Sequence, residues 1–332
     1  MPGMRQCWKV WIGVLVLAAP VASHAASCAT EAALSAQERN ALAAVGMQFA
    51  QAVVRQDEGT LQAALLPAVQ QDWPGMKAAV EDGAAIVKGG QAQLRALYVL
   101  DNASAKAVAD QEFFCSNVSG TLTVTITMRA LPPGRYAVVL ADAAGSALGG
   151  QMGFVLVWDA TGATPVWKLG GLSLRQGVVD GHDGVWYWTH ARVLAAGPHT
   201  WSAWYTYEMA RALLLPVDFL SSNNMDKLLQ EQGRILNSPA SAFPYSLKDG
   251  PRLWAVEGIR VDTSLHEADL GITYESIGVT DPSAQRTEAI AVMSALLKAH
   301  PGLRENFHGL WAYASINGNI TPIIELPMGQ IP

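Results

Sequence analysis

The densest group of polar, chemically able residues in the sequence is Asp180-Gly181-His182-Asp183-Gly184. Carboxylates and imidazoles both coordinate divalent ions, so the segment could form a metal or ligand loop between two predicted units. Glycine and aspartate are also typical of a solvated turn that has no further role. Both interpretations stay open, and Asp180, His182 and Asp183 are candidate ligand-binding residues. We interpret His266-Glu267-Ala268-Asp269 as the polar tip between two strands.

A second candidate is a concentration of aromatic residues between positions 186 and 207. Exposed rings there could stack on a sugar or an extended peptide, whereas buried rings would hold helices together. Helical spacing places Tyr207 on one face with Ala203 and Ala210, but this face cannot hold every ring. The remaining candidates for binding a protein, a sugar or a small apolar ligand are Trp186, Trp188, Trp201, Trp204 and Tyr205.

Catalytic signatures are missing from the sequence. It contains no Gly-x-Ser-x-Gly nucleophile motif, no phosphate loop, no dinucleotide fingerprint after a predicted strand, and no His-Glu-x-x-His zinc motif. None of the histidines after residue 25 lies four residues from another. We therefore predict no catalytic residue, no cofactor and no metal ligand.

The first 25 residues predict export. Arg5 and Lys9 precede an apolar run over residues 11–19, and small residues follow as far as Ala25. This order is typical of a secretory signal peptide, and the run is shorter than the roughly 20 residues that span a bilayer as a helix. We expect cleavage after Ala25, no membrane span thereafter, and a periplasmic or secreted bacterial protein. A lipoprotein is the alternative, because small residues precede Cys28, although the usual upstream Leu is missing.

Two cysteines remain after the expected cleavage, Cys28 and Cys115. An even count in an oxidising compartment predicts a disulfide between them. The alternative is two isolated thiols, one of them a buried core residue.

Composition limits the class of protein. A chain of 332 residues with 50% hydrophobic residues can bury two or three cores. The 22 Lys and Arg are outnumbered by 28 Asp and Glu, for a net charge of −6. This balance argues against a nucleic-acid partner.

Residues 30–176 predict helices followed by strands. Ser35 and Glu38 have capping-box spacing ahead of a helical stripe, and a second helix is expected to end near Asp72-Trp73-Pro74. From Gln91 the period becomes two, and threonines alternate with apolar residues over 121–128. With a closing strand over 166–172, this order resembles the nuclear transport factor two-like (cystatin-like cone) superfamily. The resemblance implies a twisted sheet wrapped around an apolar pocket, used for catalysis in some members and for binding or dimerisation in others. The catalytic acids of its isomerase members have no matching positions here.

Residues 180–237 predict a helical segment. Tyr187, Ala191 and Leu194 are followed by a Gly197-Pro198 break and a second helical stripe, which resembles one tetratricopeptide helix pair. One pair cannot bury its apolar faces alone, so we expect it to dock on the preceding domain. A third helix is expected over 225–236.

Residues 251–328 predict a small β-β-α-α-β unit after a linker over 239–250. The expected strands are 253–261, 270–276 and 320–326, and the first helix begins at Asp281-Pro282. Leu303, Phe307, Leu310 and Trp311 have the spacing of the second helix.

Together these patterns predict an α+β protein whose function is binding or scaffolding in an exported, soluble form. The alternative is a small hydrolase or isomerase that uses a pocket in the cone-like domain. A deep cavity with Asp or Glu facing Tyr or His would favour the enzyme, and a filled cone would favour the binding protein.

Overall fold

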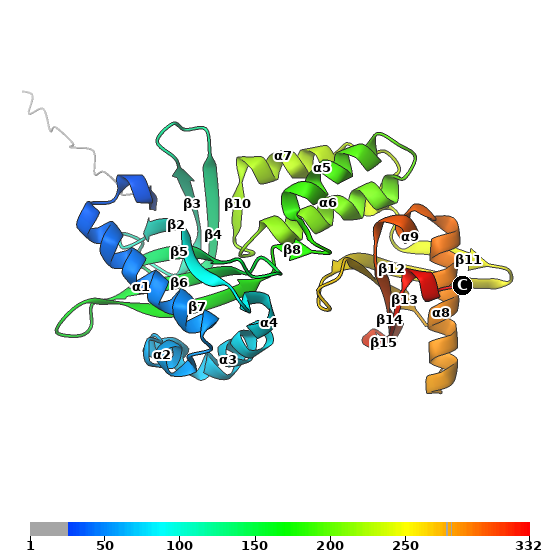
Figure 1. Ribbon diagram of the computed structural model, residues 1–332, viewed down its shortest axis with the longest axis horizontal. Helices are drawn as coiled ribbons and strands as arrows, with labels where there is room; N and C mark the ends of the chain where they lie inside the picture. The colour runs from blue at the N-terminus through cyan, green and yellow to red at the C-terminus, as the bar shows by residue number, and fades with distance from the viewer. Residues whose placement is uncertain (1–25, 277, 280) are drawn as a thin grey trace, which may run out of the picture.

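The computed structural model describes residues 26–276, 278–279 and 281–332, so the predicted signal peptide lies outside the described residues. The α+β class is confirmed: helices precede antiparallel sheets in the first half, and the chain ends in a strand-rich region. Figure 1 shows two lobes, with the helical segment of residues 184–233 above and between them.

Four helices cover one face of the five-stranded first sheet. The helices are α1 (Ala36–Val54), α2 (Glu58–Ala63), α3 (Trp73–Asp82) and α4 (Ala84–Val87). The sheet has the order β1-β2-β5-β6-β7, with β1 (Ser27–Thr30), β2 (Gln91–Asp101), β5 (Arg135–Ala144), β6 (Gln151–Asp159) and β7 (Val166–Arg175). The Ser35 hydroxyl accepts from the backbone N–H of Glu38, which fixes the start of α1 as the capping-box spacing predicts.

A second, three-stranded sheet covers the opposite face of the first sheet. Its order is β10-β4-β3, with β3 (Ala109–Ser116), β4 (Thr123–Leu131) and β10 (Leu220–Ser222). The threonine-rich alternation belongs to β4, whose Val124 and Ile126 are buried between the two sheets. The central strand β5 is therefore buried on both faces.

The space between the helices and the first sheet is filled by side chains. Phe49 of α1 and Phe154 of β6 are at most 2% exposed, and their ring centroids lie 6.1 Å apart. Gly46 allows α1 to approach β5 closely, because a Cβ there would lie 2.5 Å from Val139. The N-terminal lobe thus has a solid core between α1 and the sheet.

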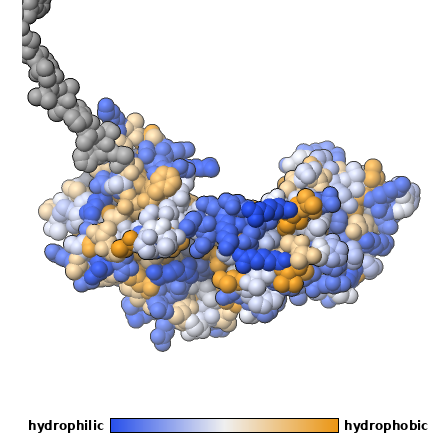
Figure 2. All heavy atoms as spheres, turned by 90° about the horizontal axis from the view of Figure 1, so that it is seen from above, coloured by the Kyte–Doolittle hydropathy of each residue, from blue (hydrophilic) through white to orange (hydrophobic). Residues whose placement is uncertain are grey.

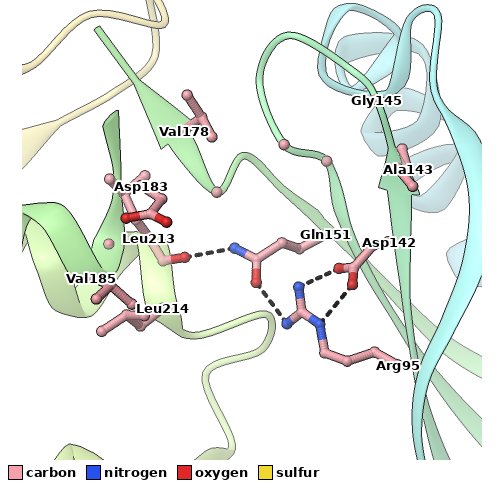
Figure 3. Close-up of a pocket in the computed structure, with 15 residues that line it drawn as sticks. Arg95, Asp142, Ala143, Gly145, Gln151, Val178, Asp183, Val185, Leu213 and Leu214 are labelled. Carbon is pink, nitrogen blue, oxygen red and sulfur yellow. Dashed lines mark hydrogen bonds and ion pairs between the residues drawn. The ribbon is translucent and has the colours of Figure 1, made fainter. Parts of the chain in front are cut away.

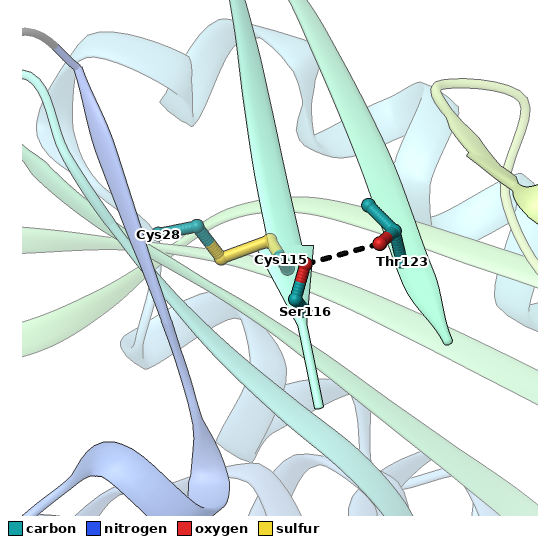
Figure 4. Close-up of a disulfide and its surroundings, with 4 residues drawn as sticks. All are labelled: Cys28, Cys115, Ser116 and Thr123. Carbon is teal, nitrogen blue, oxygen red and sulfur yellow. Dashed lines mark hydrogen bonds between the residues drawn. A yellow bond between two sulfur atoms is a disulfide. The ribbon is translucent and has the colours of Figure 1, made fainter. Parts of the chain in front are cut away.

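The predicted disulfide is present and joins the two sheets. Cys28 lies on β1 at the edge of the first sheet, and Cys115 lies on β3 (Figure 4). Their Cα atoms are 5.2 Å apart and the residues are 87 positions apart in sequence. Because Cys115 is 1% exposed, the bond is part of the core between the sheets.

The predicted end of the second helix is wrong. The chain forms a 3₁₀ turn over Pro67–Asp72 and then begins α3 at Trp73. Proline in the first turn of a helix loses no intrahelical hydrogen bond, so Pro74 starts a helix here and does not stop one.

The helical segment contains α5 (Gly184–Ala195), α6 (Thr200–Leu214) and α7 (Asn223–Gly233), after a two-stranded hairpin of β8 (Val178–Val179) and β9 (His182–Asp183). Its buried rings share one core with the C-terminal sheet, and no residue of the first sheet belongs to that core. The expectation that the helix pair buries its rings on the preceding domain is therefore wrong. The pair needs a covering surface, as expected, but the C-terminal lobe supplies it.

The C-terminal sheet has the order β11-β12-β13-β14-β15. Its elements are β11 (Tyr245–Asp249), β12 (Arg252–Asp262), β13 (Asp269–Glu275), α8 (Pro282–Ala299), α9 (Gly302–Asn306), β14 (Gly309–Ile316) and β15 (Asn319–Pro327). The pairing of β13 with β14 is parallel and the other pairings are antiparallel.

Two expectations for this lobe need correction. The predicted linker contains strand β11, and the second predicted helix ends at Asn306, so that Leu310 and Trp311 belong to β14. The spacing of four apolar residues fitted a helix by coincidence, whereas the burial of residues 310, 312 and 314 follows the strand period.

Candidate binding site between the lobes

A pocket of about 370 Å³ lies where the first sheet meets the helix pair (Figure 3). Arg95 and Asp142 reach it from β2 and β5, and Asp183, Val185 and Leu214 reach it from the opposite side. The two walls come from segments with separate hydrophobic cores. Such a junction is a common place for a ligand site.

The polar centre of this pocket is a chain of hydrogen bonds from one wall to the other. Arg95 donates to both carboxylate oxygens of Asp142, and its Nη1 donates to Gln151 Oε1 at 2.9 Å. The Gln151 Nε2 group donates in turn to the Leu213 carbonyl at 2.7 Å. Gln151 is 3% exposed, so this amide is held in one orientation and fixes the Arg95 guanidinium.

Several glycines line the pocket, and most of them are required by packing. A Cβ at Gly184 would lie 2.6 Å from Leu214 Cγ, and one at Gly177 would lie 2.8 Å from the Gly149 carbonyl. Gly145 is required for a different reason. Its φ of +85° favours glycine, although a Cβ added there would meet no other atom within 4 Å. The loop 144–150 is held against the segment before the helix pair, because the Leu148 and Gly149 carbonyls accept from the Gly177 N–H.

The polar segment 180–184 is used mainly as a structural turn. Asp180 and Gly181 have φ values of +50° and +75° between β8 and β9, as a two-residue hairpin loop requires. Asp183 Oδ1 accepts from the Trp186 N–H at 2.8 Å and caps α5. His182 stacks on Trp186. Among the three candidates, only Asp183 lines the pocket of Figure 3.

Asp180 links the hairpin to the C-terminal lobe. Its Oδ2 accepts from the Ala268 N–H at 3.2 Å, next to Glu267 in the segment that the sequence assigned to a strand-connecting tip. A hydrogen bond with Asp180 raises the pKa of Glu267 above its usual value, assisted by burial and by repulsion between the two carboxyl groups. The hairpin is thereby tied to the loop that precedes β13.

The predicted aromatic platform is largely part of the core. Trp201 and Tyr205 are 7% and 2% exposed, while Trp188 and Trp204 are partly buried against the same core. Trp186 is 40% exposed. Exposure alone therefore leaves only Trp186 as a stacking surface among the five predicted rings.

The faces of three of these indoles already have partners. His182 and His190 stack on Trp186 with centroids 3.7 and 4.8 Å away. The Arg192 guanidinium lies 4.6 Å from the centroid of Trp188, and His300 stacks on Trp201 at 3.6 Å. A sugar or peptide would have to displace these groups before it could stack.

Sequence reasoning missed Arg95, Asp142 and Gln151 as a group. They lie on three strands, and Arg95 is 47 positions from Asp142 and 56 positions from Gln151. Only the pairing of β2 with β5 and of β5 with β6 brings them together, through the registers Gln93↔Asp142 and Asp142↔Gln151. Register of this kind is not encoded in local spacing.

A second, more apolar pocket of about 560 Å³ lies between β2 and the loop that joins β3 to β4. Tyr98, Leu122 and Val124 contribute to its lining, and Val118 at its edge is 88% exposed. A larger share of its lining is apolar than in the pocket beside Gln151.

Viewed from above, the space-filling surface dips between the two lobes, and hydrophilic residues gather over this middle part (Figure 2). Within the described residues, no helix is both long and apolar enough to cross a membrane. Comparison with known proteins found no matching family, no matching curated protein and no matching solved structure.

Proposed function

We propose that the protein is an exported binding or scaffolding protein that holds its ligand in the pocket between the N-terminal lobe and the helix pair. The observation that carries this proposal is the Arg95–Gln151–Leu213 chain, in which a buried amide holds a cationic side chain at a junction of two cores. The disulfide in the N-terminal lobe is consistent with export.

The filled interior of the N-terminal lobe supports binding over catalysis. In the hydrolase or isomerase alternative, a substrate would enter between the helices and the first sheet. Phe49, Phe154 and Met152 occupy that space and are almost fully buried. The order of helices and strands agrees with a cone-like member of the nuclear transport factor two-like superfamily, which we retain as part of the proposal.

The pocket suits a neutral, hydrogen-bonding ligand such as a sugar or a peptide backbone. The charge of Arg95 is already balanced by Asp142 through two hydrogen bonds, so the pair presents little net charge. The rest of the lining is mainly backbone and small side chains, with Val178 and Val185 as apolar contacts. It includes one further carboxylate, Asp183, whose Oδ1 accepts from the Trp186 N–H.

A matched pair of substitutions on α5 tests this proposal. Val185 lines the pocket and is 58% exposed, whereas Val193 is 66% exposed on the same helix outside the pocket lining. We expect Val185→Arg to abolish binding of the oligosaccharides or tripeptides that raise the melting temperature of the wild-type protein, and Val193→Arg to leave it intact. The compounds are screened as one panel of oligosaccharides and one panel of tripeptides. If no compound in either panel stabilises the wild-type protein, or if the two variants bind equally well, the assignment of the pocket is contradicted.

A further inference from the structure

A histidine and two carboxylates meet at one edge of the C-terminal sheet. Asp269 begins β13, His308 immediately precedes β14, and Glu325 lies in β15 opposite Trp311. These three strands are neighbours, so residues far apart in sequence come together at the strand ends. One potential ligand atom from each of the three side chains lies within 4.8 Å of the other two.

The spacing of these atoms is close to that around a metal ion. His308 Nδ1 lies 3.0 Å from Asp269 Oδ1. Two donor atoms on a tetrahedral Zn²⁺, each about 2.0–2.2 Å from the metal, are separated by roughly 3.4 Å. The His308–Asp269 pair therefore has nearly the required separation, and small side-chain rotations would complete it with Glu325.

Glu325 has an unused buried oxygen. Its Oε1 atom is inaccessible to solvent and has no hydrogen-bond partner. Leaving such an atom without a partner is costly, and a bound cation would provide one. Among the described residues, neither Asp269 nor Glu325 forms an ion pair with a lysine or arginine, and the imidazole of His308 is the one basic group that pairs with Asp269.

Gly309 leaves the space in which the two carboxylates converge. A Cβ at this position would lie 2.7 Å from Glu325 Oε1 and 2.8 Å from Asp269 Oδ1. The central strand of the three thus presents no side chain between them. The floor of the cluster is buried, since the Asp269 side chain is 1% exposed, while the His308 side chain is 40% exposed and leaves a route for an ion from solvent.

The indole of Trp311 orients one of the carboxylates. Its Nε1 group donates to Asp269 Oδ2 at 3.3 Å, which leaves Oδ1 facing His308. Ligands in metal sites usually form such a hydrogen bond with a neighbouring group, because it fixes the direction of the atom that binds the metal.

We propose that Asp269, His308 and Glu325 form a binding site for a divalent transition-metal ion of the Zn²⁺ type. An imidazole with two carboxylates suits such an ion, and three protein ligands leave a fourth position for water or a further ligand. Ca²⁺ and Mg²⁺ prefer sites made of oxygen ligands alone. This site revises the sequence prediction of no metal ligand, and it is separate from the pocket between the lobes.

Calorimetric titration of the full chain, after removal of metal by a chelator, tests the site. We expect ZnCl₂ to bind the wild-type protein saturably at one site that Glu325→Gln weakens at least about tenfold. Trp311→Phe keeps all three ligands and should weaken binding by roughly tenfold by loosening Asp269. Glu305→Gln removes an exposed carboxylate from α9 and should leave Zn²⁺ binding unchanged.

Circular dichroism establishes that each variant is folded before its titration is interpreted. Three results would overturn the proposal: no saturable Zn²⁺ binding by the wild-type protein, wild-type affinity in both Glu325→Gln and Trp311→Phe, or CaCl₂ binding as tightly as ZnCl₂. None of these results bears on the sugar or peptide panels, so failure of the metal site and failure of the pocket are distinguishable.

Discussion

The imidazole of His300 should make the protein less stable in mild acid. His300 follows α8 and stacks on Trp201, with centroids 3.6 Å apart and an interplanar angle of 12°. Its Nε2 atom is buried and has no hydrogen-bond partner. Burial lowers the pKa of His300 from 6.5 to about 4, because the charged imidazolium would lose its hydration there.

The sign of the effect follows from where the proton binds. Between pH 6.5 and about 4, a histidine in the unfolded chain takes up a proton while folded His300 does not. Protonation therefore favours the unfolded state, so the free energy of unfolding falls as the pH is lowered through this window. The pKa difference corresponds to roughly 3 kcal/mol, and we expect about 2 kcal/mol because solvent screens a ring that is only half-buried.

Urea unfolding at a series of pH values measures this contribution by difference. His300→Phe keeps an aromatic ring against Trp201 but cannot bind a proton, and His300→Gln is a second variant that does not titrate. Other acid-sensitive groups are common to all three proteins, so their contributions cancel in the difference. The stability of the wild type relative to either variant should fall by about 2 kcal/mol between pH 7 and pH 4. A difference that stays constant over this range would refute the idea that the fold holds His300 neutral.

Two further predictions concern the packing of the fold. Replacing Cys28 and Cys115 together by alanine should lower the free energy of unfolding by roughly 4 kcal/mol, because the disulfide closes a loop across 87 positions. A urea unfolding midpoint equal to that of the oxidised wild type would contradict this expectation. Gly184→Ala should lower the free energy of unfolding by about 1–3 kcal/mol, since the new Cβ would lie 2.6 Å from Leu214 Cγ and 3.0 Å from the Ala210 carbonyl. The control Gly233→Ala places its Cβ in open space and should not lower the stability. Equal melting temperatures for the two variants would show that α5 and α6 can move apart freely.

Local signals in the sequence predicted the local features correctly. The Ser35 cap, the threonine alternation of β4 and the start of α8 at Asp281-Pro282 each depend on residues within a few positions of one another. The disulfide was also predictable, because only two cysteines remain after residue 25 and they can pair in one way. Periodicity and residue chemistry are sufficient for features of this kind.

Features that depend on strand register could not be predicted. The sequence pattern places Asp269 in a polar tip and does not single out His308, because nothing close to either residue in sequence suggests a common site. Their proximity follows from the parallel pairing of β13 with β14, which places Leu270 beside Leu310. In the same way, β10 pairs with β4 across about 95 residues and could not be recognised from its three residues.

The helical segment is bound to the two lobes by different kinds of contact, and this difference favours a ligand site on the side of the N-terminal lobe. Toward the C-terminal lobe its contacts are mainly apolar and form one continuous core, with the hydrogen bond between His190 and Asn306 beside it. Toward the N-terminal lobe they include polar links, with Gln151 donating to the Leu213 carbonyl and Ser173 donating to the Pro216 carbonyl. An apolar core excludes water and leaves no room for a ligand, whereas a hydrogen-bonded junction can exchange a water molecule for a hydroxyl or amide of a ligand at small cost. The pocket beside Gln151 is therefore a part of this junction where a ligand can enter without disrupting a core.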